Sequence, residues 1–151
     1  MYGYYLTKEE EKEIINKQNW IIERDIGNDI EKKVYDLPSI RQKSFYGKAK
    51  VIESNSGYWL LSYNTIVCYV GMRENRYNRK VPDTVIKLWD GYSATTMNHI
   101  NDFFSYVGMS ILGGKKFWEN LKTNKIYNAN KLLREEAEKR KQIFNKQNRT
   151  I

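Results

Sequence analysis

The sequence contains only one histidine, His99, and one cysteine, Cys68, and this scarcity limits the chemistry that the chain could perform. A Ser-His-Asp type of centre would need His99 as its base, with Ser93 or Asp102 as its partner. Cys68 stands in an apolar stretch, which favours a small buried hydrophobic role over a reactive thiolate. His99 falls beside the apolar stripe of its expected helix, so we expect a partly exposed or capping histidine. The residues therefore predict a protein that is not an enzyme, with an unrecognised activity at His99 as the minor alternative.

Metal and cofactor motifs are also missing from the sequence. A zinc site needs about four Cys, His or carboxylate ligands, and one cysteine with one histidine cannot make a Cys/His site. Asp25, Asp29 and Glu31 are the nearest approach to a carboxylate site, but their spacing does not fit a calcium loop. No P-loop, dinucleotide-binding glycine pattern or zincin motif occurs. We therefore expect neither a metal nor a cofactor.

Basic side chains interleaved with aromatic ones are the most informative feature. Residues 41–50 hold four cations and no acid, and residues 73–80 hold four cations and one acid. Arginine suits bidentate contact with phosphate, and tyrosine can stack on an unpaired base. The alternative is solvated loops whose charge only aids solubility. The candidate residues for binding a partner or nucleic acid are Arg73, Arg76, Tyr77, Arg79, Lys80, Arg41, Lys43, Lys48 and Lys50. Whether the two segments share one face of the molecule stays open.

The start of the helix expected after Ser93 is a further candidate site. Hydroxyls and free backbone N–H groups at a helix N-terminus can bind an anion together. The candidate anion contacts are Ser93, Thr95, Thr96 and His99. Ordinary capping of the helix by Ser93 is the favoured alternative.

Composition is consistent with a binding protein. The 151 residues fit a single domain spanning 1–151, and the 14% content of aromatic residues argues against disorder. The formal net charge of +8 attracts nucleic acid or an acidic protein face. The N-terminus does not resemble a signal peptide, and no apolar run is long enough to span a membrane. We therefore expect a cytoplasmic protein without a membrane partner.

Periodicity predicts an α+β fold. Thr7 and Glu10 form a capping box that opens an N-terminal helical segment over 7–35, which is either one helix or two helices broken at Gly27. A core of β-meander and helix follows over 44–107, with three or four short antiparallel strands. Residues 58–63 and 65–70 are either one bent strand or two short strands, and residues 71–82 are expected to form a loop.

Three helical features flank or follow the meander. Apolar residues at Met97, Ile100, Phe104 and Val107 predict an amphipathic helix that begins after Ser93 and ends at Gly108. A charged C-terminal helical segment is expected over 115–146, made of a short turn over 115–121 and a long helix from about 128. Residues 147–151 are expected to form a frayed tail.

Residues 43–51, 61–67 and 89–103 carry a resemblance to a known family. In this order they resemble a small domain of uncharacterised function carried by phages, conjugative plasmids and related mobile elements of Firmicutes. The most specific part is the pattern Ser-x-Thr-Thr-x-x-His-Ile-x-x-Phe, which begins at Ser93. The resemblance covers residues 43–107, and the basic loop at 73–82 looks longer than the family's usual turn.

The resemblance implies an accessory protein of a mobile element and supplies no catalytic residues. Small proteins from that setting often antagonise host defence, and anti-CRISPR proteins are similar to this chain in size and in lacking enzyme motifs. The implied partner is then a Cas9-type nuclease or its guide RNA complex, bound in the host cytoplasm. The alternative is DNA or RNA, bound during replication, transfer or regulation of the element. The oligomeric state stays open.

Overall fold

The computed structural model describes residues 3–5, 9, 33–38 and 48–148. Most of the expected N-terminal helical segment, together with the break considered at Gly27, lies outside the described residues. So does the tail beyond residue 148.

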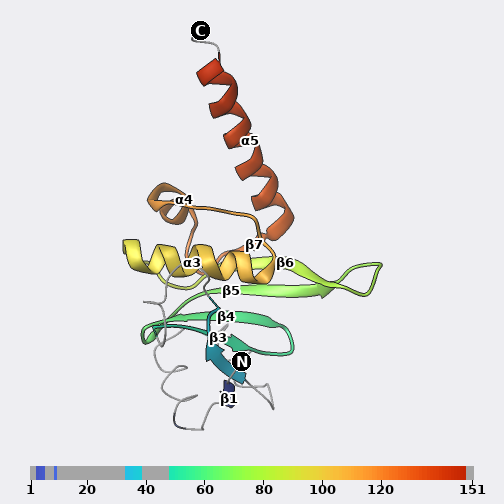
Figure 1. Ribbon diagram of the computed structural model, residues 1–151, viewed down its shortest axis with the longest axis vertical. Coiled ribbons are helices and arrows are strands. Elements are labelled where there is room, and N and C mark those ends of the chain that lie inside the picture. The colour runs from blue at the N-terminus through green and yellow to red at the C-terminus, as the bar shows by residue number, and fades with distance from the viewer. Residues whose placement is uncertain (1–2, 6–8, 10–32, 39–47, 149–151) are drawn as a thin grey trace.

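Within the described residues, one antiparallel sheet of seven strands forms the centre of the molecule (Figure 1). Each strand pairs with the next strand in the chain, so the sheet is a continuous meander. The strands are β1 (Gly3–Tyr5), β2 (Lys33–Asp36), β3 (Ala49–Glu53), β4 (Gly57–Ser62), β5 (Thr65–Glu74), β6 (Lys80–Lys87) and β7 (Ile126–Asn128).

The α+β class with an antiparallel meander is as predicted, but the expected three or four strands were too few. Strands β3 to β6 correspond to the predicted meander, and β4 and β5 are two strands joined by a tight turn at Tyr63, where φ is 55°. The prediction of helix as far as Tyr35 was wrong. Val34 and Tyr35 are buried in strand β2, where they pair with Ile52 and Val51 of β3. Long-range pairing overrides a local four-residue apolar spacing here.

Residues 71–82 were predicted as a loop, and this was also wrong. Most of them extend β5 and β6 into a hairpin, with a loop of only five residues between Glu74 and Lys80. Strand prediction depends on apolar residues alternating with polar ones, and that alternation arises only where one face of a strand is buried. Residues 73–80 are all polar or charged except Tyr77, so the pattern was absent.

Three helices lie in the second half of the chain. Helices α3 (Ala94–Val107) and α4 (Lys115–Asn120) come between β6 and β7, and α5 (Ala129–Asn148) follows β7. The predicted ends of α3 are confirmed. Ser93 Oγ accepts a hydrogen bond from the Thr96 N–H at 3.1 Å, and Gly108 ends the helix with φ at 93°. A positive φ is easily adopted only by glycine and a few other residues, so this glycine fixes the helix terminus.

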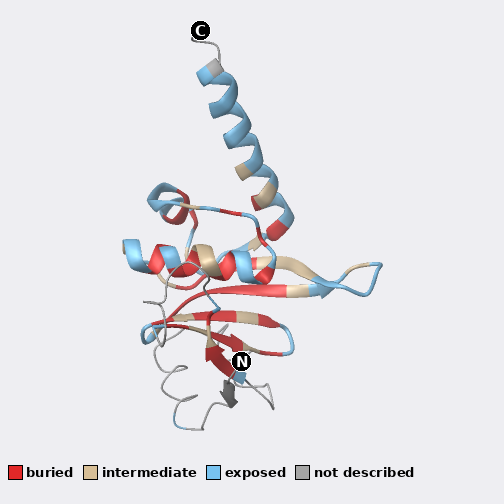
Figure 2. Cartoon of the chain, viewed as in Figure 1, coloured by how far each residue is buried: buried red, intermediate tan, exposed pale blue. Residues whose placement is uncertain are grey.

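The sheet is buried on both faces (Figure 2). Helix α3 packs on one face, where Ile100, Phe103 and Phe104 join the inward side chains of the central strands. The opposite face has its own buried cluster, formed by Val34, Ile52, Trp59, Ile66, Tyr69, Ile86 and Leu88. Burial on both sides explains why residues 66–71 of β5 are all buried and read as a continuous apolar run. None of the described helices is long and apolar enough to cross a membrane.

Lys87, at the end of β6, is a buried cation with a structural role. Its side chain is only 3% exposed, and its ammonium donates hydrogen bonds to the carbonyl oxygens of Trp118 at 2.8 Å and Leu121 at 3.0 Å. Its Nζ also lies 5.0 Å from the centre of the Trp118 ring. The last carbonyls of a helix lack partners within the helix, and a cation satisfies them. Lys87 therefore attaches the end of α4 to the sheet.

We expect Lys87→Met to destabilise the protein. Methionine keeps most of the apolar stem but leaves the buried Leu121 carbonyl without the ammonium donor, at a cost of about 1–3 kcal/mol. The Trp118 carbonyl also loses the ammonium but still accepts from the Leu121 N–H at 3.2 Å. The free energy of unfolding in urea measures the effect. Lys116→Met is the control because Lys116 is exposed on α4. Equal stability of Lys87→Met and the wild type would contradict a structural role for the ammonium.

Candidate functional site

The far end of the β5–β6 hairpin projects beyond the rest of the sheet (Figure 1). We call residues 72–83 the arm. Its two strands pair through Met72 with Pro82 and Glu74 with Lys80, after a register shift at Gly71. A side chain on Gly71 would overlap the hydroxyl of Thr84, so glycine allows the close approach at the base of the arm. Burial changes sharply there, from the buried strand interior to the exposed tip (Figure 2).

Hydrogen bonds hold the tip of the arm in one conformation. The Asn75 N–H donates to the Arg79 carbonyl at 2.9 Å, and the Asn78 N–H donates to the Asn75 carbonyl at 3.0 Å. The Asn75 side-chain oxygen accepts from the N–H groups of Tyr77 at 2.9 Å and Arg79 at 3.1 Å. Asn78 has φ at 60°, a conformation that asparagine tolerates better than most residues. The sequence Asn75–Arg79 therefore encodes a defined hairpin loop.

This loop presents cations and one aromatic ring to solvent. Tyr77 is 67% exposed, and the Arg76 guanidinium carbon lies 5.0 Å from the centre of its ring. Residues 75–80 contain three cations, Arg76, Arg79 and Lys80, and no acid. Arg73, lower on the arm, lies 3.4 Å from the Asp83 carboxylate and is partly neutralised by it. The arm is thus most basic at its tip. Asp83 is a partner that local sequence inspection missed, because the pair forms only across the hairpin.

The structure does not bring Lys48 and Lys50 to the arm. Lys48 precedes β3, whose Ala49 pairs with Ser62 of β4, and Ser62 in turn pairs with Thr65 at the start of β5. The tip follows the opposite end of β5, nine residues further along, or roughly 30 Å at the rise of a strand. Lys48 is exposed and Lys50 is half-buried at this distant end of the sheet. Arg41 and Lys43 lie outside the described residues, so any binding role for the segment stays a prediction.

The side chains near the start of α3 are more deeply buried than the sequence indicated. Ser93 caps the helix and Thr95 is exposed, but Thr96 and His99 are buried. The expectation of a partly exposed or capping His99 was wrong, since its side chain is 0% exposed. Ser62 Oγ lies 2.8 Å from His99 Nδ1 and 3.1 Å from Thr96 Oγ1. The missed residue is Ser62, whose only sequence signal was a hydroxyl at the end of an apolar strand.

Ser62 and His99 have the spacing of a nucleophile and its base, but their surroundings favour a structural role. Both side chains are buried, with Ser62 only 3% exposed, so a substrate has no direct access to the pair. The contact joins α3 to β4 instead. Cys68 is fully buried as predicted, and burial raises the pKa of its thiol, which keeps it protonated. Among the residues that the structure describes, no cluster of His, Cys, Asp and Glu could hold a metal ion.

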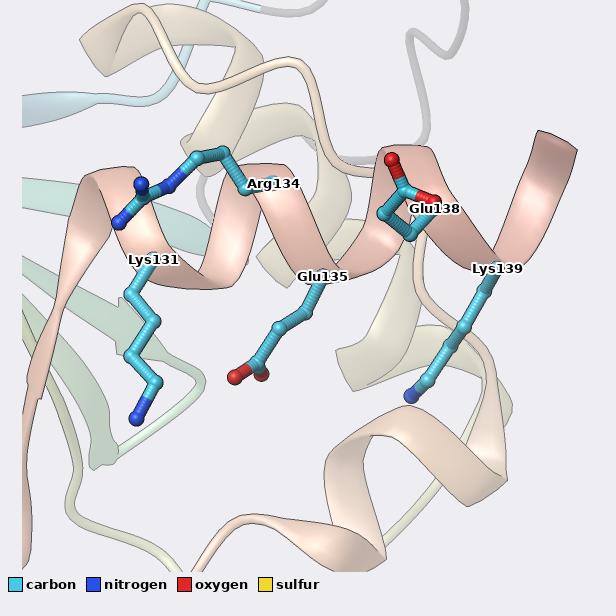
Figure 3. A pocket seen from close by; sticks show the side chains of 5 residues that line it. All are labelled: Lys131, Arg134, Glu135, Glu138 and Lys139. Carbon is cyan, nitrogen blue, oxygen red and sulfur yellow. The ribbon is translucent and has the colours of Figure 1, made fainter.

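A shallow hollow runs along one side of α5 (Figure 3). The side chains that line it are all charged, and they come from Lys131, Arg134, Glu135, Glu138 and Lys139. The lining contains three cations and two acids, a mixture of signs found on the solvent-facing side of a helix. Acid and base largely cancel, so this hollow has less attraction for an anion than the tip of the arm.

We expect the stability of the protein to fall in mild acid because of His99. Burial lowers the pKa of His99, and Lys48 lowers it further against the opposing effect of Asp102. The unfolded histidine titrates near ~6.5. Below that pH the unfolded state binds a proton that the folded state resists, so the free energy of unfolding decreases as the pH drops from ~6.5 towards the lower folded pKa.

Urea unfolding of the wild type and His99→Gln at pH 7.5 and pH 5 measures this dependence. The variant is expected to be less stable at pH 7.5 but to lose less stability on acidification. Ser62→Ala is the control, because it removes the hydrogen bond while retaining the titrating imidazole. An identical loss in the wild type and His99→Gln would contradict the assignment.

The comparison with protein families gives one match that covers more than half of the chain. A model described as a family of unknown function, DUF8033, matches residues 35–120, which run from β2 through the arm and α3 to the end of α4. Helix α5 lies outside the match. No curated protein and no solved structure matches the chain. The fold core and the arm are therefore both part of the matched region, and the chain belongs to the DUF8033 family.

Proposed function

We propose that this protein binds nucleic acid without catalysing a reaction, and that the arm is its main binding element. The observation that supports the proposal is the tip of the arm. Three cations and an exposed tyrosine stand together, without an acid, on a projecting loop that five residues of hydrogen-bonded backbone hold in place. A preformed loop loses little conformational entropy on binding, so more of its contact energy appears as affinity.

The shape of the arm suits a duplex. The major groove of B-DNA is about 12 Å wide and admits a two-stranded β-ribbon. Arg76 and Arg79 can contact phosphates or the acceptor edge of guanine, and Lys80 adds a point charge. Tyr77 at the tip offers a ring that can stack on a base or wedge against a base step.

The resemblance to mobile-element proteins extends this proposal to a biological setting. The nucleic acid would belong to a host-defence nucleoprotein, such as a Cas nuclease with its guide RNA, and the protein would act as an inhibitor in the host cytoplasm. A net charge of +8 supports contact with exposed RNA or an acidic protein face and has the wrong sign for a mimic of DNA. The second setting is replication, transfer or regulation of the element, where free DNA or RNA is the partner.

We expect neutralising the tip to weaken binding and to reduce its salt dependence. The variant Arg76→Gln, Arg79→Gln, Lys80→Gln removes three cations at exposed positions. Each lost phosphate contact lowers the slope of log K against log salt by roughly 0.9 for duplex DNA, so the reduction can reach about 2.7. Fluorescence anisotropy with a labelled duplex, a single strand and a guide-like RNA measures it between ~50 and ~200 mM salt.

The control for the tip variant is Lys116→Gln, Lys122→Gln, Lys125→Gln. These lysines are exposed on α4 and the turn before β7. They flank the end of β6 that lies away from the arm, where Asn124 bonds to Lys87. Equal effects of the two triple variants on affinity and salt dependence would contradict the proposal that the arm is the main binding element. Absence of wild-type binding to all three probes at ~50 mM salt would remove nucleic acid as the partner, since nonspecific electrostatic binding should be visible there.

We expect Tyr77→Ala to reduce affinity without changing the salt slope, because stacking is not an electrostatic contact. Stacking on a base is worth about 1–3 kcal/mol, or roughly five-fold to more than a hundred-fold in Kd. Tyr77→Phe keeps the ring and should keep most of the affinity. If Tyr77→Phe loses as much as Tyr77→Ala, the hydroxyl rather than the ring makes the contact, and stacking is the wrong account.

A further inference from the structure

Helix α5 leaves the body of the protein soon after it begins (Figure 1). Ala129 and Leu132 are buried in the core and Leu133 is partly buried, but every residue from Ala137 to Gln147 is exposed. A polar helix of this length gains little stability by itself in water, since isolated short helices are marginal. The exposed part is therefore a projection whose residues are not buried against the described core (Figure 2).

Charge is distributed unevenly along this helix. Its first half contains the acids Glu135, Glu136 and Glu138, whereas residues 139–148 contain four cations and no acid. Lys139 lies 3.3 Å from Glu136, which leaves Arg140, Lys141 and Lys146 as the cations that continue beyond the acids. The distal half of α5 is thus a second basic projection, separate from the arm.

Both projections start at the same corner of the sheet. Strand β7 pairs with β6 so that Asn128, the last residue before α5, lies opposite Thr84, the first residue after the arm. The end of α3 reaches this corner too, because a side chain on Gly108 would lie 3.9 Å from Pro82. From this corner the arm extends to one side and α5 rises away from the sheet, so that the two enclose an open angle (Figure 1).

A hollow lies where α5 passes the end of α3. The polar residues that line it are Ser105, Ser110 and Arg140. The rest of the lining comes from Gly108, Met109, Ile111 and Leu112. Two hydroxyls beside a guanidinium offer several donors to one phosphate group.

We propose that the distal half of α5, with this hollow at its foot, is a second contact for the phosphate backbone of the nucleic acid that the arm binds. The proposal rests on the proposed function and deepens it. A duplex lies in the angle between the arm and α5, and the neighbouring cations Arg140 and Lys141 contact its phosphates. Lys146 lies on another side of the helix and adds only to the positive potential of the distal half. A polyanion matches a surface with cations and no acid. A second copy of the chain is the other partner that an exposed helix could bind. Pairing two copies of the helix would place the four cations of one copy near the four cations of the other.

The test compares the salt dependence of duplex binding in four proteins. They are the wild type, the tip variant defined above, the helix variant Arg140→Gln, Lys141→Gln, Lys146→Gln, and the lysine control variant on α4 and the following turn. Glutamine is a good helix former, so the helix variant should keep its helicity by circular dichroism. We expect the helix variant to reduce the magnitude of the slope by up to about 1.8, for two lost phosphate contacts, and the control variant to leave it near the wild-type value.

Each outcome decides one question. A helix variant that binds like the control variant, while the tip variant binds weakly, overturns the second contact and leaves the arm in place. If neither the tip variant nor the helix variant loses affinity for the duplex, the proposed function itself is overturned. Light scattering measures the mass of the wild type and of the double variant Ile143→Gln, Phe144→Gln, and so tests whether a second copy of the chain binds the helix instead. If the wild type is a dimer that these apolar changes dissociate, and the helix variant binds the duplex as the wild type does, then the helix contacts a second copy of the chain.

Discussion

The antiparallel pairing of β5 with β6 is the interaction on which the rest of the structure depends. Its inner part lies at the centre of a sheet that is buried on both faces, and its outer part continues past the core as the arm. The same ladder of backbone hydrogen bonds thus supports the core and extends the basic tip into solvent. Because the inner pairs fix the register, the loop at Asn75–Arg79 is held by the whole sheet and not only by its own short hydrogen bonds.

Buried polar contacts then fix the helices on this sheet. Ser62 with Thr96 and His99 joins α3 to β4, and Lys87 joins the end of α4 to β6. Each of these contacts buries a polar group that only one defined partner can satisfy. Each contact therefore favours one position of the helix on the sheet over other positions that would bury a similar apolar area. The residues with the most distinctive chemistry in the core therefore explain the architecture, whereas the proposed binding function rests on the exposed cations of the arm and of α5.

Local signals predicted what local interactions determine. Ser93 and Gly108 mark both ends of α3, and the basic segment of the arm was visible as cations around Tyr77. Features that depend on distant residues were missed. Strand β2 exists because Val34 pairs with Ile52, and His99 is buried because Ser62 meets it across the sheet. The separation of Lys48 and Lys50 from the arm along β5 required the register, which no periodicity in the sequence encodes.

The most direct measurement of the central claim is a titration of the isotope-labelled protein with a short duplex, followed by backbone amide NMR at low salt. If the arm is the main binding element, the amides of Arg73 to Lys80 shift first and most, and those of the fully buried residues such as Trp59 and Phe103 change little. Shifts that cluster instead around Lys48 at the far end of the sheet, or no shifts at all, would contradict the account.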